Sequence, residues 1–290
     1  PLAAPGNVLG VRAMTLEPDP KVVELRGPEA IALHHVYGTN GLVLELEVGL
    51  GPAHPWLEGV ASFEEFDAAL EFAHALACAP GIVKKGVTLL AAPITDVLMQ
   101  ASPPLRGAAP AGAHTVFFVV AAFAEEATAT LLHSFGGSLS HRRTAEEVRR
   151  TNRTLTEYTW NHTTLNALRV DPTFTYLQTA FDPARQREQV RALKAHFGDE
   201  VMVHLEFIRT KEGAINASGL QLVRYTSEER LREIMRIHAE HGVYLMNPHA
   251  WVVEDGKAGP INPAALPAKR RFDPLGLLNP GKLRSADAPP

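Results

Sequence analysis

The sequence has very little cysteine, no cluster of charge of one sign and no long apolar run. Cys78 is the one cysteine among 290 residues, which excludes an intrachain disulfide and a cysteine-based metal cluster. It sits among alanines on a predicted helix, where a small buried filler is the expected role. A chain without disulfides fits a reducing compartment, so we expect a cytoplasmic protein.

Two further absences bear on the partners of the chain. The formal net charge is −4 and no basic block is present, which argues against nucleic acid as a partner. The longest apolar run, residues 115–124, is too short to cross a bilayer. We therefore expect neither nucleic-acid binding nor a transmembrane segment.

The composition that is present is that of a globular protein with more than one domain. Hydrophobic residues make up 46% and charged residues 21% of the chain, which is ordinary for a soluble globular fold. A length of 290 residues exceeds the usual size of a single hydrophobic core. The stretch from Gly51 to Pro55 is rich in glycine and proline and is the predicted domain boundary.

Strands with alternating polarity and helices with apolar positions three and four apart follow one another along the chain. Before the boundary we predict strands at 8–16, 21–25 and 42–50 and a helix at 30–37. After it, Ser62 to Glu65 predicts a capping box that starts a helix. The later strands are predicted at 56–61, 82–90, 115–123, 138–141, 174–180, 201–209 and 217–225. Helices are predicted at 125–135 and 227–241. One further helix is predicted to start at residue 144, and another is predicted to end at about residue 197. Two strand-helix-strand sets with antiparallel pairing predict an α+β lobe.

The segment from Arg270 to Lys282 reads RRFDPLGLLNPGK and predicts a fixed turn. Each of its two prolines lacks an N–H and biases the preceding residue away from the helical region. An amide side chain, Asn279, and a cation, Lys282, follow near the carboxyl end. On chemistry alone this is either a tail tucked onto a core or a contact for a planar polar ligand.

A glycine-flanked turn, Gly38-Thr39-Asn40-Gly41, precedes the strand at 42–50. Glycines let backbone N–H groups approach a ligand closely, and a following strand offers main-chain hydrogen bonds. The alternative is an ordinary helix-to-strand turn.

These two segments carry a family resemblance. FDPLGLLNPGK resembles the DPxGLLNPGK segment that closes the C-terminal lobe against the flavin in FAD-linked oxidases and dehydrogenases of the vanillyl-alcohol-oxidase (PCMH-type) superfamily. Residues 35–48 look like the GTLGIITEATLRL segment of that superfamily, although Asn40 stands where leucine is common and Leu44 where threonine is frequent. The resemblance implies FAD as the cofactor. It implies cofactor contacts at Gly38, Thr39, Asn40, Gly41, Leu42, Val43, Asn279 and Lys282, and the two departures favour backbone contacts over side-chain contacts.

The resemblance also implies an architecture. Gly6 to Val11 resembles a strand that follows the pyrophosphate-binding glycine loops in the family, so we expect a fragment that lacks those loops. The expected fold class is α+β, with the end of a PCMH-type FAD-binding domain followed by a cap that resembles a duplicated ferredoxin-like unit. The expected domains are 1–51 for the flavin-domain tail, 52–268 for the substrate cap and 269–290 for a segment that returns to the flavin.

Candidate catalytic residues come from two polar and aromatic stretches of the cap. Residues 156–165 resemble a TWNHTTL segment of one bacterial branch of the family and, if helical, place Tyr158 and His162 on one face. Residues 244–251 contain Asn247 and His249 after a helix and a strand. Oxidation of an alcohol by hydride transfer to a flavin needs a base near the hydroxyl, and histidine suits that task.

Other polar residues bear on the substrate and on metals. A carboxylate substrate would need cations, for which Arg142, Arg143, Arg153 and Lys282 are candidates. His204 to Phe207 is a faint echo of the histidine-rich HxGDGNxH motif of family lactate and glycolate dehydrogenases, which weakens the case for a 2-hydroxy acid. No carboxylate or cysteine completes a metal site around the histidine pairs, so no metal is expected. These are His34 with His35 and His238 with His241, all expected on helix surfaces.

The resemblance implies an FAD-dependent oxidoreductase that oxidises an alcohol or a 2-hydroxy acid such as lactate or glycolate. Its electron acceptor would be oxygen, a quinone or an electron carrier, and a homo-oligomer is an open expectation. One alternative is a cap-type domain that binds a ligand or partner without flavin. Another is one subunit of a split flavoenzyme.

Overall fold

The computed structural model describes residues 6–210, 212–246, 250–255 and 263–287. The chain divides into two compact units. Unit 1 consists of Pro1–Pro52 with Met246–Pro290, and unit 2 consists of Ala53–Leu245. No helix in the described ranges is long and apolar enough to span a bilayer.

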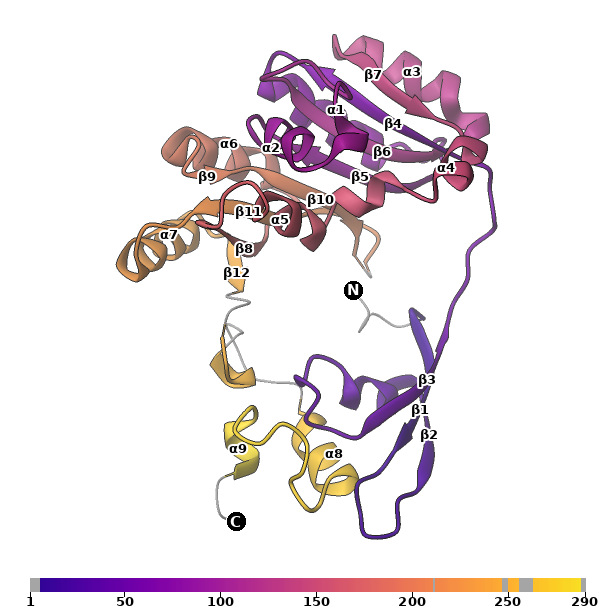
Figure 1. The fold of residues 1–290 in the computed structure, drawn as a ribbon, viewed down its shortest axis with the longest axis vertical. Coiled ribbons are helices and arrows are strands. Elements are labelled where there is room, and N and C mark those ends of the chain that lie inside the picture. The colour runs from indigo at the N-terminus through magenta and orange to yellow at the C-terminus, as the bar shows by residue number, and fades with distance from the viewer. Residues whose placement is uncertain (1–5, 211, 247–249, 256–262, 288–290) are drawn as a thin grey trace. The chain divides into compact units, whose positions relative to one another are not determined.

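Unit 2 is built on one large antiparallel sheet with the strand order β12-β8-β11-β10-β5-β6-β4-β7, and β9 pairs with β11 (Figure 1). Its first half contains β4 (Trp56–Phe63), α1 (Phe66–Cys78), β5 (Lys84–Leu90), β6 (His114–Ala121), α3 (Glu125–Ser134) and β7 (Ser138–Arg143). Its second half contains β8 (Phe174–Ala180), α6 (Gln186–Phe197), β9 (Val201–Met202), β10 (His204–Arg209), β11 (Ile215–Arg224), α7 (Glu228–Glu240) and β12 (Tyr244–Met246).

The two halves repeat one topology. Each half runs strand, helix, strand, strand, helix, strand, and each places its fourth, first, third and second strands in that order across the sheet. The second strands of the two halves pair with each other, with Leu90 opposite His204 and Thr88 opposite Glu206. This arrangement is a duplicated ferredoxin-like unit, so the expected α+β cap is confirmed.

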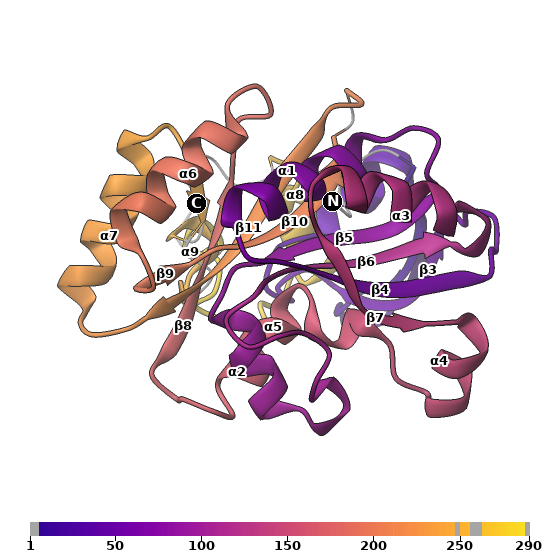
Figure 2. The same ribbon diagram turned by 90° about the horizontal axis from the view of Figure 1, so that it is seen from above.

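Helices cover both faces of this sheet (Figure 2). On one face, α1, α3, α6 and α7 pack a core that includes Leu76, Leu132, Leu193 and Ile234. On the other face lie segments inserted between the repeated elements. These are α2 (Ile94–Ala101), η2 (Pro103–Leu105), α4 (Ala145–Thr151), η4 (Leu155–Tyr158) and α5 (Asn161–Ala167). The second core lies beneath most of them and includes Leu98, Leu155 and Phe117.

Local capping signals were predicted with mixed success. Thr144 caps α4 through a capping box with Glu147, and the Ser227 hydroxyl accepts the Arg230 N–H at the start of α7. The capping box predicted at Ser62 is wrong, because β4 continues to Phe63 and α1 begins without a side-chain cap after Glu65. The Ser62 hydroxyl instead donates to Ser140 on the neighbouring strand.

Two predicted burial states are also wrong. Cys78 is exposed because it lies one position beyond the buried face of α1, which ends with Leu76 and Ala77. His238 is fully buried because it follows Leu231 and Ile234 at the three-and-four spacing of the inner face of α7.

Unit 1 contains a three-stranded antiparallel sheet with the order β2-β1-β3. Its elements are β1 (Val8–Met14), β2 (Val22–Arg26), η1 (Gly27–Leu33), β3 (Leu42–Val48), η5 (Val253–Asp255), α8 (Ala265–Phe272) and α9 (Arg284–Asp287). The core joins Val11, Leu25, Ala30 and Phe272. The strand prediction for β3 is confirmed. The helix predicted at 30–37 is instead the short 3-10 helix η1.

Candidate functional site

The C-terminal segment of unit 1 forms the predicted turn from Asp273 onward, whereas residues 270–272 still belong to α8. One buried carboxylate holds this turn. Asp273 follows the last residue of α8 and accepts the Leu277 N–H at 2.9 Å and the Leu278 N–H at 2.8 Å. Lys269, one helical turn earlier, pairs with the same carboxylate and donates to the Leu278 carbonyl at 3.1 Å. Burial alone would raise the pKa of Asp273, but the bonds from Lys269, Leu278 and Leu277 hold this pKa below its usual value.

This turn is anchored to the glycine-flanked turn near the other end of the sequence. The Asn279 side-chain amide donates to the Tyr37 carbonyl at 2.6 Å, across 242 positions of chain. Gly38 has φ +67°, and a Cβ there would stand 2.9 Å from Asn279 Nδ2. Position 38 therefore needs glycine both for its backbone conformation and for the approach of Asn279.

The three following residues are buried and have structural partners. The Thr39 hydroxyl donates to the Val36 carbonyl at 2.7 Å. Asn40 donates to the Ala32 carbonyl at 3.1 Å and to the Ala265 carbonyl at 2.8 Å, which ties the turn to α8. Gly41 packs under Phe272. The side chains of Thr39 and Asn40 are thus engaged within the protein, and only backbone groups remain for a ligand.

The other predicted cofactor contacts, Leu42, Val43 and Lys282, lie at the edge of the two joined turns. Leu42 and Val43 begin β3 and are exposed. The Lys282 N–H donates to the Asn279 carbonyl at 3.2 Å, and its ammonium stands over the Trp251 ring. All eight residues lie in unit 1, and their role toward a cofactor stays a prediction.

The catalytic candidates of unit 2 are not brought together. The continuous helix that would place Tyr158 and His162 on one face does not form, because η4 ends at Tyr158 and α5 begins at Asn161. Tyr158 is buried with its hydroxyl 2.9 Å from that of Ser102, whereas His162 is exposed. Asn247 and His249 lie outside the described residues.

A buried polar cluster lies next to this segment. Glu206 on β10, 2% exposed, accepts the Thr88 hydroxyl at 2.6 Å and the Trp160 N–H at 2.7 Å. His204 Nε2 lies 2.8 Å from the same carboxylate, and His204 Nδ1 is buried without a partner. Trp160 has φ +53°, a backbone conformation that favours glycine, so its bond to Glu206 holds a strained residue in place.

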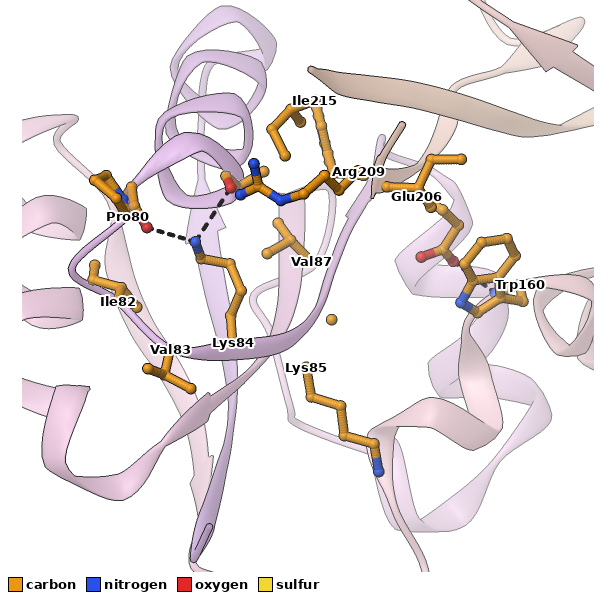
Figure 3. A pocket seen from close by; sticks show the side chains of 15 residues that line it. Pro80, Ile82, Val83, Lys84, Lys85, Val87, Trp160, Glu206, Arg209 and Ile215 are labelled. Carbon is orange, nitrogen blue, oxygen red and sulfur yellow. Dashed lines mark hydrogen bonds between the residues drawn. The ribbon is translucent and has the colours of Figure 1, made fainter. Parts of the chain in front are cut away.

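Glu206 lines a pocket of about 480 Å³ between β5 and the end of β10 (Figure 3). Lys84, Lys85 and Arg209 also line it. Lys84 Nζ donates to the carbonyls of Ala77 at 3.2 Å and Ala79 at 2.6 Å, at the end of α1. Burial lowers the pKa of Lys84, and the nearby Arg209 charge lowers it further.

These residues were not selected from the sequence, although a signal for two of them exists. His204 and Glu206 alternate with Val203, Leu205 and Phe207, which places both polar side chains on one face of a strand. The arginines predicted to bind a carboxylate have other contacts. Arg142 pairs with Glu125, and Arg143 donates to the Arg153 carbonyl. Across the described ranges, no group of three or more His, Cys, Asp or Glu side chains could hold a metal ion.

Comparison with known proteins gives a result at the level of fold. No protein-family model and no curated protein matches the sequence. Among solved structures, the chain is similar to alkyldihydroxyacetonephosphate synthase in two crystal forms. In the P212121 form the TM-score is 0.53 at 12% identity, with 95% of this chain and 53% of the synthase covered. In the P1 form the TM-score is 0.57 at 13% identity, with coverages of 94% and 53%.

The chain thus spans about half of the length of each synthase chain. At such low identity the similarity concerns the fold alone. The expected fold class is confirmed: the chain has an α+β architecture with a duplicated ferredoxin-like sheet, and it shares this fold with the synthase structures.

Proposed function

We propose that this chain is the flavin-contacting and substrate-binding part of an FAD-dependent oxidoreductase that acts on an alcohol or hydroxy acid. The hydrogen bond from Asn279 to the Tyr37 carbonyl carries the proposal. It joins the two segments whose sequences resemble flavin-contacting segments of one superfamily. A fold of the FAD-linked oxidase type supports the same function.

The residues of the two joined turns suit a flavin edge in chemical type. Asn279 offers an amide, and the exposed stretch from Tyr37 to Gly38 offers backbone groups beside it. A flavin ring carries carbonyl and imide groups that such donors and acceptors bind. When bound, FAD would supply the hydride acceptor. The two turns would hold and orient it, and Asp273 would keep Asn279 in place by fixing the backbone of Leu277 and Leu278.

The substrate would bind in unit 2, where the pocket between β5 and β10 offers cations and a carboxylate. His162 and His249 stay proposed bases for the substrate hydroxyl, and Asn247 stays a proposed member of the same group. Tyr158 stays a proposed member of this group. We propose a positioning role for it, because its hydroxyl contacts that of Ser102. The electron acceptor is proposed to be oxygen, a quinone or an electron carrier.

The first test is the visible spectrum of protein purified from its complete reading frame, before and after FAD is added. A flavin that is reduced on anaerobic mixing with one member of a panel of alcohols and hydroxy acids would support the proposal. A folded protein that retains no flavin after FAD is added would instead support a cap-type binding domain.

Asn279→Ala tests the residue that carries the proposal. The variant loses one hydrogen bond between neutral groups, and with it the ordering of the turn. We expect flavin retention to fall about tenfold, because a loss of about 1.4 kcal/mol corresponds to a factor of ten in affinity. Flavin content after gel filtration measures this directly. Asn216→Ala, on β11 of unit 2, is the matched control and should retain flavin like the parent. Unchanged flavin content in Asn279→Ala would contradict the assignment.

A further inference from the structure

The sheet of unit 2 opens where its two halves meet. The ladder between β5 and β10 runs from Leu90 opposite His204 to Thr88 opposite Glu206. Beyond that pair, the first residues of β5 and the last residues of β10 line a pocket of about 480 Å³. This pocket is termed the junction notch below. Its walls come from both ferredoxin-like halves, because Lys84 to Val87 belong to one and Glu206 to Arg209 to the other.

The charges around the junction notch are not balanced. Lys84, Lys85 and Arg209 line it together with a single acid, Glu206. The Glu206 carboxylate already accepts hydrogen bonds from Thr88 and Trp160 and contacts His204. Arg209 donates to the Gly213 carbonyl rather than to an acid. Figure 3 shows Lys84 and Arg209 pointing toward one another, whereas Lys85 points away from both. Two cations on one side of a concave site without a free carboxylate attract an anion.

Lys84 and Arg209 are the two cations available to a ligand in the junction notch. The Arg209 charge contributes to the lowered pKa of Lys84, after burial, which is the larger cause. Lys84 holds two carbonyls at the end of α1 and keeps further donor capacity, because an ammonium has three N–H groups. Arg209 likewise has donors beyond the one that binds Gly213.

The remaining wall of the junction notch is apolar. Figure 3 shows the side chains of Ile82, Val83, Val87 and Ile215 around Lys84 and Arg209, with the Trp160 ring beside Glu206. Trp160 is 46% exposed, and its backbone N–H donates to Glu206, so the residue is anchored at the edge of the site. A ligand with a charged end and a compact apolar body would satisfy both kinds of wall.

We propose that the junction notch binds a small organic oxyanion, a carboxylate or a phosphate ester, through Arg209 and Lys84. Its apolar body packs on the aliphatic wall. The inference that this oxyanion is the substrate rests on the proposed function. The inference that the junction notch binds the oxyanion does not, because binding is measured without flavin and without turnover.

The test is calorimetric titration of the 290-residue chain with benzoate and with phenyl phosphate, and benzamide serves as the neutral probe of the same shape. We expect both anions to bind at low ionic strength, benzamide to bind at least tenfold more weakly, and added salt to weaken the anions selectively. The stronger of the two anions identifies the headgroup as carboxylate or phosphate.

Variants locate the site. Arg209→Gln should weaken anion binding about tenfold, the usual value of one charge-assisted hydrogen bond. Lys84→Gln should weaken it several-fold, and the double variant of Lys84 and Arg209 more than either. Arg232→Gln, an exposed arginine on α7 outside the junction notch, is the matched control and should bind like the parent. Far-UV circular dichroism confirms that each variant is folded.

Three results would overturn the proposal. These are no binding of either anion to the parent, equal binding of benzamide, and unchanged binding in the double variant. Flavin content, measured on protein purified from its complete reading frame, decides the proposed function separately, so flavin binding there without anion binding here rejects this inference alone.

Discussion

At the scale of single residues, unit 2 shows how a buried carboxylate is accommodated. An isolated charge in a protein interior is costly unless hydrogen bonds compensate it. Glu206 receives such bonds from Thr88 on β5 and from the Trp160 backbone. His204 Nε2 lies 2.8 Å from the same carboxylate, and His204 Nδ1 is buried without a hydrogen-bond partner. Glu206 therefore joins β10, β5 and the start of α5.

Replacing Glu206 should expose this role. Glu206→Ala removes the acceptor of the hydrogen bonds from Thr88 and Trp160 and should lower the free energy of unfolding by about 3 kcal/mol or more. Glu206→Gln keeps one acceptor oxygen and should cost less. Urea unfolding followed by tryptophan fluorescence measures both. Equal stability of Glu206→Ala and the exposed control Glu240→Ala would show that the cluster does not stabilise the fold.

His238 makes stability depend on pH. It is buried on α7, with Nδ1 2.8 Å from the Ile234 carbonyl and Nε2 3.0 Å from the Gln221 side chain. Burial lowers its pKa, and neighbouring His241 and His196 lower it further against the raising effect of Ile234. The native state therefore binds fewer protons than the unfolded state. Its stabilising contribution is complete above the unfolded pKa of about 6.5 and is lost as the pH falls toward the folded pKa.

His238→Gln should flatten that acid dependence. Urea unfolding at pH 7.5 and pH 5.5 should show a smaller loss of stability on acidification in the variant than in the parent. The variant should also be less stable at pH 7.5, by about 1 to 3 kcal/mol, because buried hydrogen bonds are disturbed. His162→Gln, at an exposed position, is the control. The same acid loss in parent and His238→Gln would assign the dependence to other groups.

At the scale of elements, local sequence rules predicted what is decided locally. β8 was predicted with its observed bounds, because alternation identifies a strand wherever one face is buried. The start of a helix at residue 144 was predicted, and the capping box there satisfies its own donors. Ser62 has the same motif, yet its residues continue β4, where pairing with both β6 and β7 outweighs a cap.

The candidate site was predictable only in part, for a related reason. The resemblance in two segments named Asn279 and the turn at Gly38 as cofactor contacts, but it did not predict the hydrogen bond from Asn279 to the Tyr37 carbonyl. The junction notch arises where β5 meets β10, so Thr88 and Glu206, 118 positions apart, come together only in the folded sheet. Periodicity places His204 and Glu206 on one face but does not say which strand lies opposite.

The turn after α8 is the element whose stability rests most on one side chain. Asp273→Ala should lower the stability of unit 1 by about 3 kcal/mol or more, since it leaves Lys269 buried without its partner and frees the N–H groups of Leu277 and Leu278. Asp255→Ala, which removes an exposed ion pair with Arg284, should cost less than about 1 kcal/mol. Limited proteolysis after Leu277 and urea unfolding both measure the difference. Similar protection in the two variants would contradict this account.

At the scale of the whole molecule, unit 2 has the features of a domain that folds by itself. Its sheet is continuous through the β5–β10 pair, and helices cover both faces. Every residue of its two hydrophobic cores falls between Leu57 and Leu245. The first core draws on both halves, for example Leu76 from α1 and Leu193 from α6, so neither half completes it alone.

We therefore expect residues 53–245 to fold when expressed alone, with one cooperative urea transition and near-ultraviolet dichroism from Trp56 and Trp160. Residues 53–170 should fail the same test, because they leave the β5 edge without β10 and expose the first core on one side. An excised unit 2 without fixed aromatic signals would show that it depends on unit 1. A cooperative transition in 53–170 would show that the first half is the folding unit, and the pairing of Thr88 with Glu206 would then be a contact between two domains rather than the centre of one.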